Sequence, residues 1–422
     1  MEEAIEKEVF FSNDAIVLGI LIMLLAFVFV TSSSEKKGWR TFYTYFPPIL
    51  ACYFFPAIVN SLGIISGDQS NLYFVASRYL LPASLVLLCI SIDFKGIINL
   101  GPKALIMFFA ATLGIVIGGP VALLIVGALY PELAGGTGDD AVWRGLATVA
   151  GSWIGGGANQ TAMKEIYGAS DNLFASMILV DVIVANIWMG FLLYGATISE
   201  RVDKWLKADN SAIDELRVKV ENYSASISQI PAMKDTMLVL AVGFGVTALA
   251  HWVSDIITPI MASFSDTLNK YNLTSLMSGF FWLIVVATTV GLLLSFTRFK
   301  KLEGVGASRI GSVFIYVLVA TIGMKMNIAE ILNNLGLFLI GIIWMIIHVM
   351  VLLITAKIIK APFFFVAVGS QANVGGAASA PVVAAAFSPA LAAVGVLMAV
   401  LGYALGTYGA IMCAQLMQAV SP

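Results

Sequence analysis

The chain has 422 residues, of which 59% are hydrophobic and 11% are charged, and its formal net charge is −2. Soluble domains carry roughly 25% charged residues, so this composition indicates an integral membrane protein. The small net charge and the scattered basic residues argue against a nucleic-acid partner. Cys52, Cys89 and Cys413 lie in apolar stretches without ligand or redox spacing, and we interpret them as buried small hydrophobic residues.

A transmembrane helix needs about 20 apolar residues, and the chain offers about twelve such stretches. The first follows an acidic leader instead of the basic region of a secretory signal, so we expect a retained helix. The polar stretch 200–234 is expected to be a surface linker between a first membrane repeat, 1–199, and a second, 235–422. The expected spans are 15–33, 46–65, 74–93, 103–129, 144–165, 172–199, 235–254, 276–297, 308–325, 335–358, 361–387 and 390–418.

The two halves resemble each other in three places that occur in the same order, which predicts an internal duplication. These anchors pair Ser91–Ile98 with Thr321–Ile328, Gly151–Ala162 with Gly369–Ala380, and Tyr194–Ala196 with Tyr408–Ala410.

The charge bias at equivalent loops indicates that the two copies are inverted in the membrane. Asp139 and Asp140 precede the first glycine-rich segment, whereas Lys357 and Lys360 precede the second. Six spans in each half would nevertheless leave the copies parallel. Either one span is miscounted, or one stretch is re-entrant.

The glycine-rich segments Gly151–Ala162 and Gly369–Ala380 interrupt apolar stretches and are the best indication of function. Each glycine costs a helix roughly 1 kcal/mol relative to alanine, so both segments are expected to unwind. An unwound backbone at membrane depth requires surrounding protein or a watery cavity, and a matched pair is typical of a transporter's substrate site. Close helix packing by small residues is the alternative, although it leaves the neighbouring polar residues unexplained.

A half-helix that follows each break would direct free amides and a positive dipole end at an anion or carboxylate. Two breaks that cross near the midplane would form one substrate site from both halves. The expected substrate-binding residues are Ser152, Gly156, Gly157, Asn159, Gln160, Thr161, Ser370, Gln371, Asn373, Gly375, Gly376 and Ser379.

Asp181 lies about ten residues, or roughly 15 Å, into its expected span, near the bilayer centre. An ionisable group at that depth is a functional candidate by default. We expect Asp181 to carry the coupling charge, as a proton acceptor or as a Na⁺ ligand, with Asn186 bordering the same cavity. A structural acid, paired with a neighbouring helix or protonated, is the alternative.

Other polar residues allow less specific interpretations. His348 is interpreted as a hydrogen-bonded buried histidine in preference to a proton relay. Arg78 is interpreted as a headgroup anchor, with a substrate contact as the alternative, and Asp93, Lys95 and Lys325 as helix-end anchors.

Motifs for nucleotide, zinc and serine-nucleophile chemistry do not occur in the sequence. We therefore expect no enzymatic activity and no cofactor other than a coupling Na⁺ or H⁺.

The first glycine segment, the span with Asp181 and Asn186, and the second glycine segment resemble a YjcL-like bacterial membrane family of unknown function. That family is similar to the cation/proton antiporter and anion transporter superfamily. The resemblance implies an all-α polytopic protein with two inverted repeats, each with a discontinuous helix. It also implies a core domain that moves against a scaffold or dimerisation domain, and a homodimer. The chain departs from the antiporter branch because it lacks paired acids beside the first break, which favours solute symport.

The sequence thus predicts a multi-pass transporter in the bacterial cytoplasmic membrane, surrounded by lipid, which moves a small organic solute by alternating access. Two alternatives stay open: a monovalent cation/proton antiporter, and a membrane receptor that binds a ligand without moving it.

Overall fold

The computed structural model describes residues 9–46, 48–67, 69–92, 98, 100–209, 232–270, 274–325, 336–388 and 391–422. In these segments the regular structure is helical, apart from one isolated β-bridge between Phe11 and Ile65. The elements are α1 (Asp14–Ser32), α2 (Lys37–Tyr45), α3 (Pro48–Ser61), α4 (Leu72–Val75), η1 (Ala76–Leu80), α5 (Leu81–Ile90), α7 (Pro102–Leu129), α8 (Pro131–Ala134), η2 (Gly138–Asp140), α9 (Val142–Gly155), α10 (Gly157–Tyr167), α11 (Asp171–Thr197), α12 (Ser199–Leu206), α14 (Met233–Ala262), α15 (Ser265–Lys270), η3 (Thr274–Met277), α16 (Gly279–Ser295), η4 (Arg298–Val305), α17 (Ala307–Gly323), α19 (Leu337–Ile359), α20 (Phe363–Val374), α21 (Gly376–Phe387) and α22 (Ala392–Val420).

Seven helical stretches in the described segments are long and apolar enough to cross a membrane, and an eighth counts if α16 is joined to η4 across its 95° bend. The seven are α1, the continuous stretch α4–η1–α5, α7, α11, α14, α19 and α22. Helices α3 and α17 are apolar but shorter. The chain is therefore a polytopic helical membrane protein, as its composition predicts.

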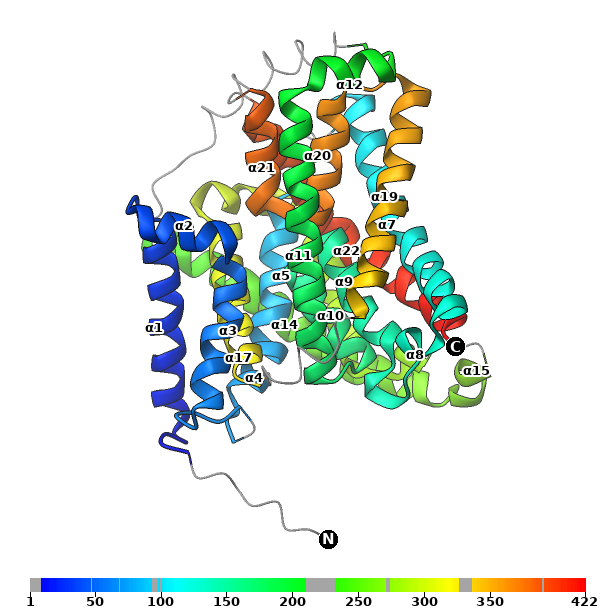
Figure 1. The fold of residues 1–422 in the computed structure, drawn as a ribbon. Coiled ribbons are helices and arrows are strands. Elements are labelled where there is room, and N and C mark those ends of the chain that lie inside the picture. The colour runs from blue at the N-terminus through cyan, green and yellow to red at the C-terminus, as the bar shows by residue number, and fades with distance from the viewer. Residues whose placement is uncertain are drawn as a thin grey trace.

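The long helices end on two opposite sides of the molecule (Figure 1). On the side of α12, Lys103 at the start of α7 pairs with Asp209 at 3.0 Å, and the Phe363 amide at the start of α20 donates to Asp203 at 2.7 Å. On the side of α8, the Ser170 amide before α11 donates to the Asp139 carbonyl at 2.9 Å. We call these the α12 side and the α8 side.

Two groups of helices lie beside each other. In the first, named the α5 bundle, α5 packs against α14, α16 and α17, and α17 packs against α3 and α1. The second, named the α7 bundle, contains α7, α9, α10, α11, α19, α20, α21 and α22. The bundles meet where α10 and α22 approach α5 and α16.

Helices α9 and α10 form a re-entrant hairpin, named hairpin 1, whose two ends both lie on the α8 side. The Arg144 guanidinium near its start donates to the Tyr167 carbonyl at its end, and the Trp143 and Tyr167 rings are 5.6 Å apart. Helices α20 and α21 form hairpin 2 in the same way on the α12 side, where Phe387 at its end lies 5.4 Å from the ring of Phe364 at its start. Figure 1 shows hairpin 2 beside α12 and hairpin 1 toward α8.

These hairpins correct the expectation that 144–165 and 361–387 cross the bilayer. A hairpin contains as many apolar residues as a span, so hydropathy does not distinguish the two. The polar stretch 200–234 begins with α12, while 210–231 lie outside the described residues, as do Asp93, Lys95 and 326–328 of the first pair of anchors.

Candidate functional site

The tip of hairpin 1 is a glycine turn that brings its two arms into backbone contact. Gly156 between α9 and α10 has φ 76°, a conformation that favours glycine because it lacks a Cβ. A Cβ atom added at Gly151 would lie 2.5 Å from the Asn159 carbonyl oxygen on the opposite arm. The glycines that were expected to break the helix therefore have two roles: Gly156 forms the turn, and Gly151 allows the two arms of hairpin 1 to pack closely.

The tip of hairpin 2 is built similarly. Helix α20 ends at Val374, and Gly376 at the start of α21 has φ 59°. The Gln371 side chain donates across the turn to the Ser379 hydroxyl at 2.7 Å. Space for this bond exists because Gly375, packed against both side chains, has no Cβ.

Helix α22 brings the two tips together. A Cβ atom added at Gly402 would lie 2.8 Å from the Ile154 carbonyl oxygen in hairpin 1 and 3.5 Å from the Ala372 carbonyl oxygen in hairpin 2. One turn further, a Cβ atom at Gly406 would lie 2.5 Å from the Gly155 Cα. The two breaks thus lie against neighbouring faces of one helix, as a shared site requires.

Buried amides are held by threonines near both tips. Thr407 on α22 donates to Asn159 Oδ1 at 2.6 Å, and Asn159 donates to the Gly155 carbonyl at 2.9 Å. In hairpin 2, Thr112 on α7 donates to Asn373 Oδ1 at 2.8 Å, and Asn373 donates to the carbonyl of Gly369, four residues earlier, at 3.0 Å. Both asparagines are fully buried. Each tip therefore holds one asparagine through the same pair of bonds.

Asp181 connects the two arms of hairpin 1. Its side chain is buried, and Trp153 Nε1 on α9 donates to Oδ1 at 2.7 Å, while Gln160 Nε2 on α10 donates to Oδ2 at 3.0 Å. The Ser152 hydroxyl also approaches the carboxylate. A buried carboxylate requires such donors because it has left water.

A second chain of hydrogen bonds holds Ser370 in hairpin 2. Trp188 Nε1 on α11 donates to the Ser370 hydroxyl at 2.8 Å, and His348 Nε2 on α19 lies 2.8 Å from the same oxygen. His348 Nδ1 lies 3.1 Å from the Ala111 carbonyl and must donate to it, so in the neutral ring Ser370 donates to Nε2. His348 is thus a hydrogen-bonded buried histidine, as expected.

Gln371 differs from the other buried amides. The side chain is 2% exposed, and its Oε1 has no hydrogen-bond partner among the described residues. If the amide is flipped, Ser379 donates to Oε1 instead and the NH₂ group is left over, so one end of Gln371 is free in either orientation. Gln371 is therefore a buried amide with an unused hydrogen-bonding group beside the tip of hairpin 2.

The structure brings the predicted site residues together on the two hairpins or, for Asp181 on α11, against hairpin 1, with one exception. Asn186 is exposed on α11 and donates to its own helix, to the Val182 carbonyl at 2.6 Å. Asn186 follows Asp181 by five residues in the helix, so the two side chains lie on different faces of α11. Residues near the breaks are Ser152, Gly156, Gly157, Asn159, Gln160, Thr161 and Asp181 for hairpin 1, and Ser370, Gln371, Asn373, Gly375, Gly376 and Ser379 for hairpin 2.

Sequence reasoning missed the partners that α7 and α22 supply. Thr112 and Thr407 lie in apolar helices without local signals, and only the fold places them against the two asparagines. Arg78 and Lys325, interpreted as anchors, each pair with an acid instead: Arg78 with Glu165 at 2.9 Å and Lys325 with Asp171 at 3.1 Å.

The chemistry at the tips suits a small ion and a polar ligand. Helices α10 and α21 begin at the tips and direct amide groups there, whereas α9 and α20 end there and direct carbonyl groups. Among the described residues, no group of three or more His, Cys, Asp or Glu side chains could hold a metal ion. Both oxygens of Asp181 accept N–H groups, and a turn of the Gln160 amide would add its oxygen as a second ligand for a Na⁺ ion there.

The fold and this site define a polytopic α-helical membrane protein with two re-entrant hairpins. A family model described as "Protein of unknown function (DUF819)" matches residues 19–420, and the chain belongs to this family. The chain is similar to "Uncharacterized membrane protein YjcL" of Bacillus subtilis (strain 168), with 25% identity over 366 residues that cover 83% of this chain and 85% of that protein. The expected relation to YjcL-like membrane proteins is confirmed.

Proposed function

We propose that the chain is a secondary active transporter that moves a small organic solute by alternating access, coupled to Na⁺ or H⁺. The observation that carries this proposal is the pair of re-entrant hairpins from opposite sides, whose glycine tips both lie against α22. Broken helices near the midplane of a membrane protein are typical substrate and ion sites of transporters. No enzymatic step is part of the proposal.

Helix directions support inverted repeats. Helix α7 runs from the α12 side to the α8 side and α11 runs back, whereas their counterparts α19 and α22 run the opposite way. If α3, α16 and α17 cross as well, each half has five crossings and one hairpin. Five is odd, so a duplicated half is inverted, and the parity difficulty of twelve spans disappears.

We assign the α12 side to the cytoplasm of a bacterial cell, because basic residues gather where helices end on that side. Acidic residues Glu132, Asp139 and Asp140 lie on the α8 side. The basic residues are Lys36, Lys37, Arg40, Lys103, Arg201, Lys204, Lys207, Arg298, Lys300, Lys301, Lys357 and Lys360.

In this proposal the α7 bundle is the moving core and the α5 bundle is the scaffold, as in the cation/proton antiporter and anion transporter superfamily. A homodimer through the scaffold follows from that likeness alone. The amide ends of α10 and α21, with the free end of Gln371, would bind an anionic solute. Asp181 would bind the coupling ion. This buried acid on α11, which accepts hydrogen bonds from both arms of hairpin 1, supports the assignment because ionisable groups inside membranes mark ion pathways.

The first test is a thermal-shift screen of small organic acids on the purified protein, in NaCl and in choline chloride at two pH values. A ligand stabilises the protein according to the ratio of its concentration to its dissociation constant. Compounds that stabilise the protein are then tested for uptake into proteoliposomes that carry a Na⁺ or pH gradient.

We expect Asp181→Asn to abolish the cation dependence of uptake, whereas Asn186→Ala, on an exposed face of the same helix, leaves it unchanged. Binding without accumulation in vesicles would instead indicate a receptor. Dissipation of a pH gradient by Na⁺ or K⁺ alone, without solute, would indicate an antiporter. Unaltered cation dependence in Asp181→Asn would contradict the role of Asp181.

A further inference from the structure

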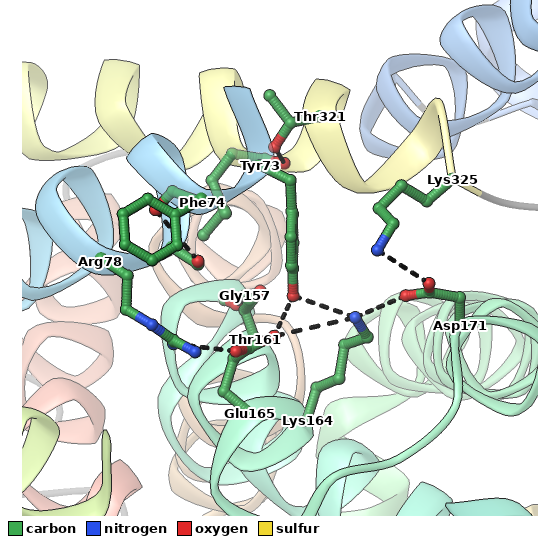
Figure 2. A network of polar contacts seen from close by, with 12 residues as sticks. Tyr73, Phe74, Arg78, Gly157, Thr161, Lys164, Glu165, Asp171, Thr321 and Lys325 are labelled. Carbon is green, nitrogen blue, oxygen red and sulfur yellow. Dashed lines mark hydrogen bonds and ion pairs between the residues drawn. The ribbon is translucent and has the colours of Figure 1, made fainter. Parts of the chain in front are cut away.

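A chain of charged and polar side chains joins the base of hairpin 1 to the α5 bundle (Figure 2). Arg78 on η1 pairs with Glu165 on α10 at 2.9 Å, and the Tyr73 hydroxyl on α4 donates to the same carboxylate. Lys164 donates to the Tyr73 oxygen at 2.9 Å and pairs with Asp171 at 2.6 Å. Asp171 also pairs at 3.1 Å with Lys325, which follows α17.

Nearly every link of this chain connects the two bundles. Tyr73, Arg78 and Lys325 belong to the α5 bundle, whereas Lys164, Glu165 and Asp171 belong to hairpin 1 and the start of α11. Two ammonium groups lie near the Tyr73 ring, that of Lys164 at 4.7 Å and that of Lys325 at 4.8 Å from the ring centre. The network therefore fastens hairpin 1 to its neighbours as long as both charges of each pair persist.

Burial makes these pairs dependent on one another. The side chain of Lys164 is 6% exposed and that of Glu165 is 12% exposed, so separation of the bundles must rehydrate both or give them new partners. Charge-assisted bonds in such an environment are stronger than neutral ones. The network thus favours one arrangement of the bundles over others.

The helix that carries Arg78 is irregular at that residue. Residues Ala76–Leu80 form a π-helical turn, and His251 Nε2 on α14 donates to the Arg78 carbonyl at 2.9 Å. Single π turns within α-helices are frequent at functional sites. The turn directs Arg78 to Glu165, and the Arg78 guanidinium lies 4.3 Å from the Phe280 ring of α16.

Hairpin 2 lacks such charged residues at its base when the two halves are aligned so that Gly151 corresponds to Gly369. Val382 and Val383 then occupy the positions of Lys164 and Glu165, and Val382 is 53% exposed. The two hairpins are thus secured unequally, and the strong connection lies on the α8 side.

We propose that this network is the gate that closes the path to the hairpin tips from the α8 side, and that the structure is in the state closed to that side. This inference rests on the proposed function, because a gate requires a path. Separation of Arg78 from Glu165 and of Lys325 from Asp171 releases hairpin 1 from the α5 bundle. Thr161, one helical turn from Glu165 toward the tip and fully buried, then becomes accessible from that side.

The test measures access with a membrane-impermeant maleimide. Cys52, Cys89 and Cys413, all buried, are replaced by alanine, and Thr161→Cys supplies the only thiol. We expect Glu165→Gln with Asp171→Asn to raise the labelling rate about tenfold, since the rate follows the population of the open state. Arg78→Glu should also raise the rate, and Arg78→Glu with Glu165→Arg should lower it again.

The matched control is Asp209→Asn, which removes the ion pair with Lys103 on the α12 side and should leave labelling of the Thr161→Cys thiol unchanged. Vesicles of both orientations identify the side, because only one should show the increase. The gate proposal would be overturned if the double variant Glu165→Gln with Asp171→Asn, or the variant Arg78→Glu, lost thermal stability without faster labelling. The assay reports access alone, so its result and that of the uptake assay can fail separately.

Discussion

Replacement of Gly406 by alanine should destabilise the protein, because α22 and α9 touch there backbone to backbone. The added Cβ would lie 2.5 Å from the Gly155 Cα, whereas ordinary contacts of a Cβ begin near 3.4 Å. It would also meet the Asn159 side-chain nitrogen. Neither the backbone of α9 nor the hydrogen-bonded Asn159 is free to move aside, so α22 must shift away from hairpin 1.

The magnitude follows from two opposing terms. Overpacking of a close contact costs typically 1–3 kcal/mol, and contact with backbone places Gly406→Ala at about 3 kcal/mol. Alanine in place of glycine stabilises a helix by about 1 kcal/mol, which leaves a net loss of about 2 kcal/mol. Gly190→Ala on α11 is the matched control: nothing lies within 4 Å of its added Cβ, so it should gain up to about 1 kcal/mol.

Thermal unfolding in detergent, followed by intrinsic fluorescence at one fixed scan rate, ranks the unfolding midpoints of wild type, Gly406→Ala and Gly190→Ala. A fixed rate is needed because membrane proteins of this size often unfold irreversibly. A loss of 1 kcal/mol lowers the midpoint by roughly 2–4 °C in proteins somewhat smaller than this one. Gly406→Ala at or above the wild-type midpoint would refute the close contact between α22 and hairpin 1.

Two further predictions concern the buried amides. Thr407→Val removes the donor to Asn159 and should cost about 1–3 kcal/mol in the same unfolding assay, whereas Thr289→Val, at a more exposed bond to Tyr408, should cost less than about 1 kcal/mol. Gln371→Leu should leave stability near wild type, since one lost bond of about 1 kcal/mol is offset by removal of an unpartnered buried group, yet it should abolish uptake. Asn373 is the matched control, because its side-chain amide is fully hydrogen-bonded. Asn373→Leu should lower the unfolding midpoint by several degrees. If Gln371→Leu and Asn373→Leu lowered the midpoint equally, the unpartnered end of Gln371 would be contradicted.

The sequence predicted the long helices and the location of both breaks. Apolar runs of sufficient length identify α1, α7, α11, α14, α19 and α22, because a bilayer selects for length and hydropathy. The glycines at 156, 375 and 376 lie in the segments expected to unwind. These features are local, so a single sequence contains them.

The course of the chain after each break could not be predicted in the same way. Hydropathy reports the surroundings of a residue and not the direction in which the backbone leaves a turn. The parity of the repeats was the one signal in the sequence for a re-entrant stretch. The contacts of Arg144 with Tyr167 and of Phe364 with Phe387, which close the hairpins, join residues 23 positions apart in each case.

Pairing between distant segments explains the remaining differences. Asn186 was expected to border the same cavity as Asp181, but the two lie about 140° apart around α11 and the fold places only Asp181 against hairpin 1. Arg78 and Lys325 resembled ordinary helix-end anchors because their acidic partners lie at least 87 residues away along the chain. Such partners are defined by the packing of the bundles, which no local pattern encodes.

The position of Asp181 links the proposed ion site to the proposed gate through one short helix. A proton or Na⁺ at Asp181 places positive charge beside the N–H groups that its carboxylate accepts, and Trp153 has only a donor to offer. Gln160 is the partner that can adapt, by turning its amide oxygen toward the ion. Gln160 and Lys164 lie four residues apart on one face of α10. A rearrangement at Gln160 is therefore transmitted along this helix to the base of hairpin 1. On the proposed mechanism, ion binding at Asp181 therefore alters the hairpin arm that carries the gate, without any ligand contact to the gate itself.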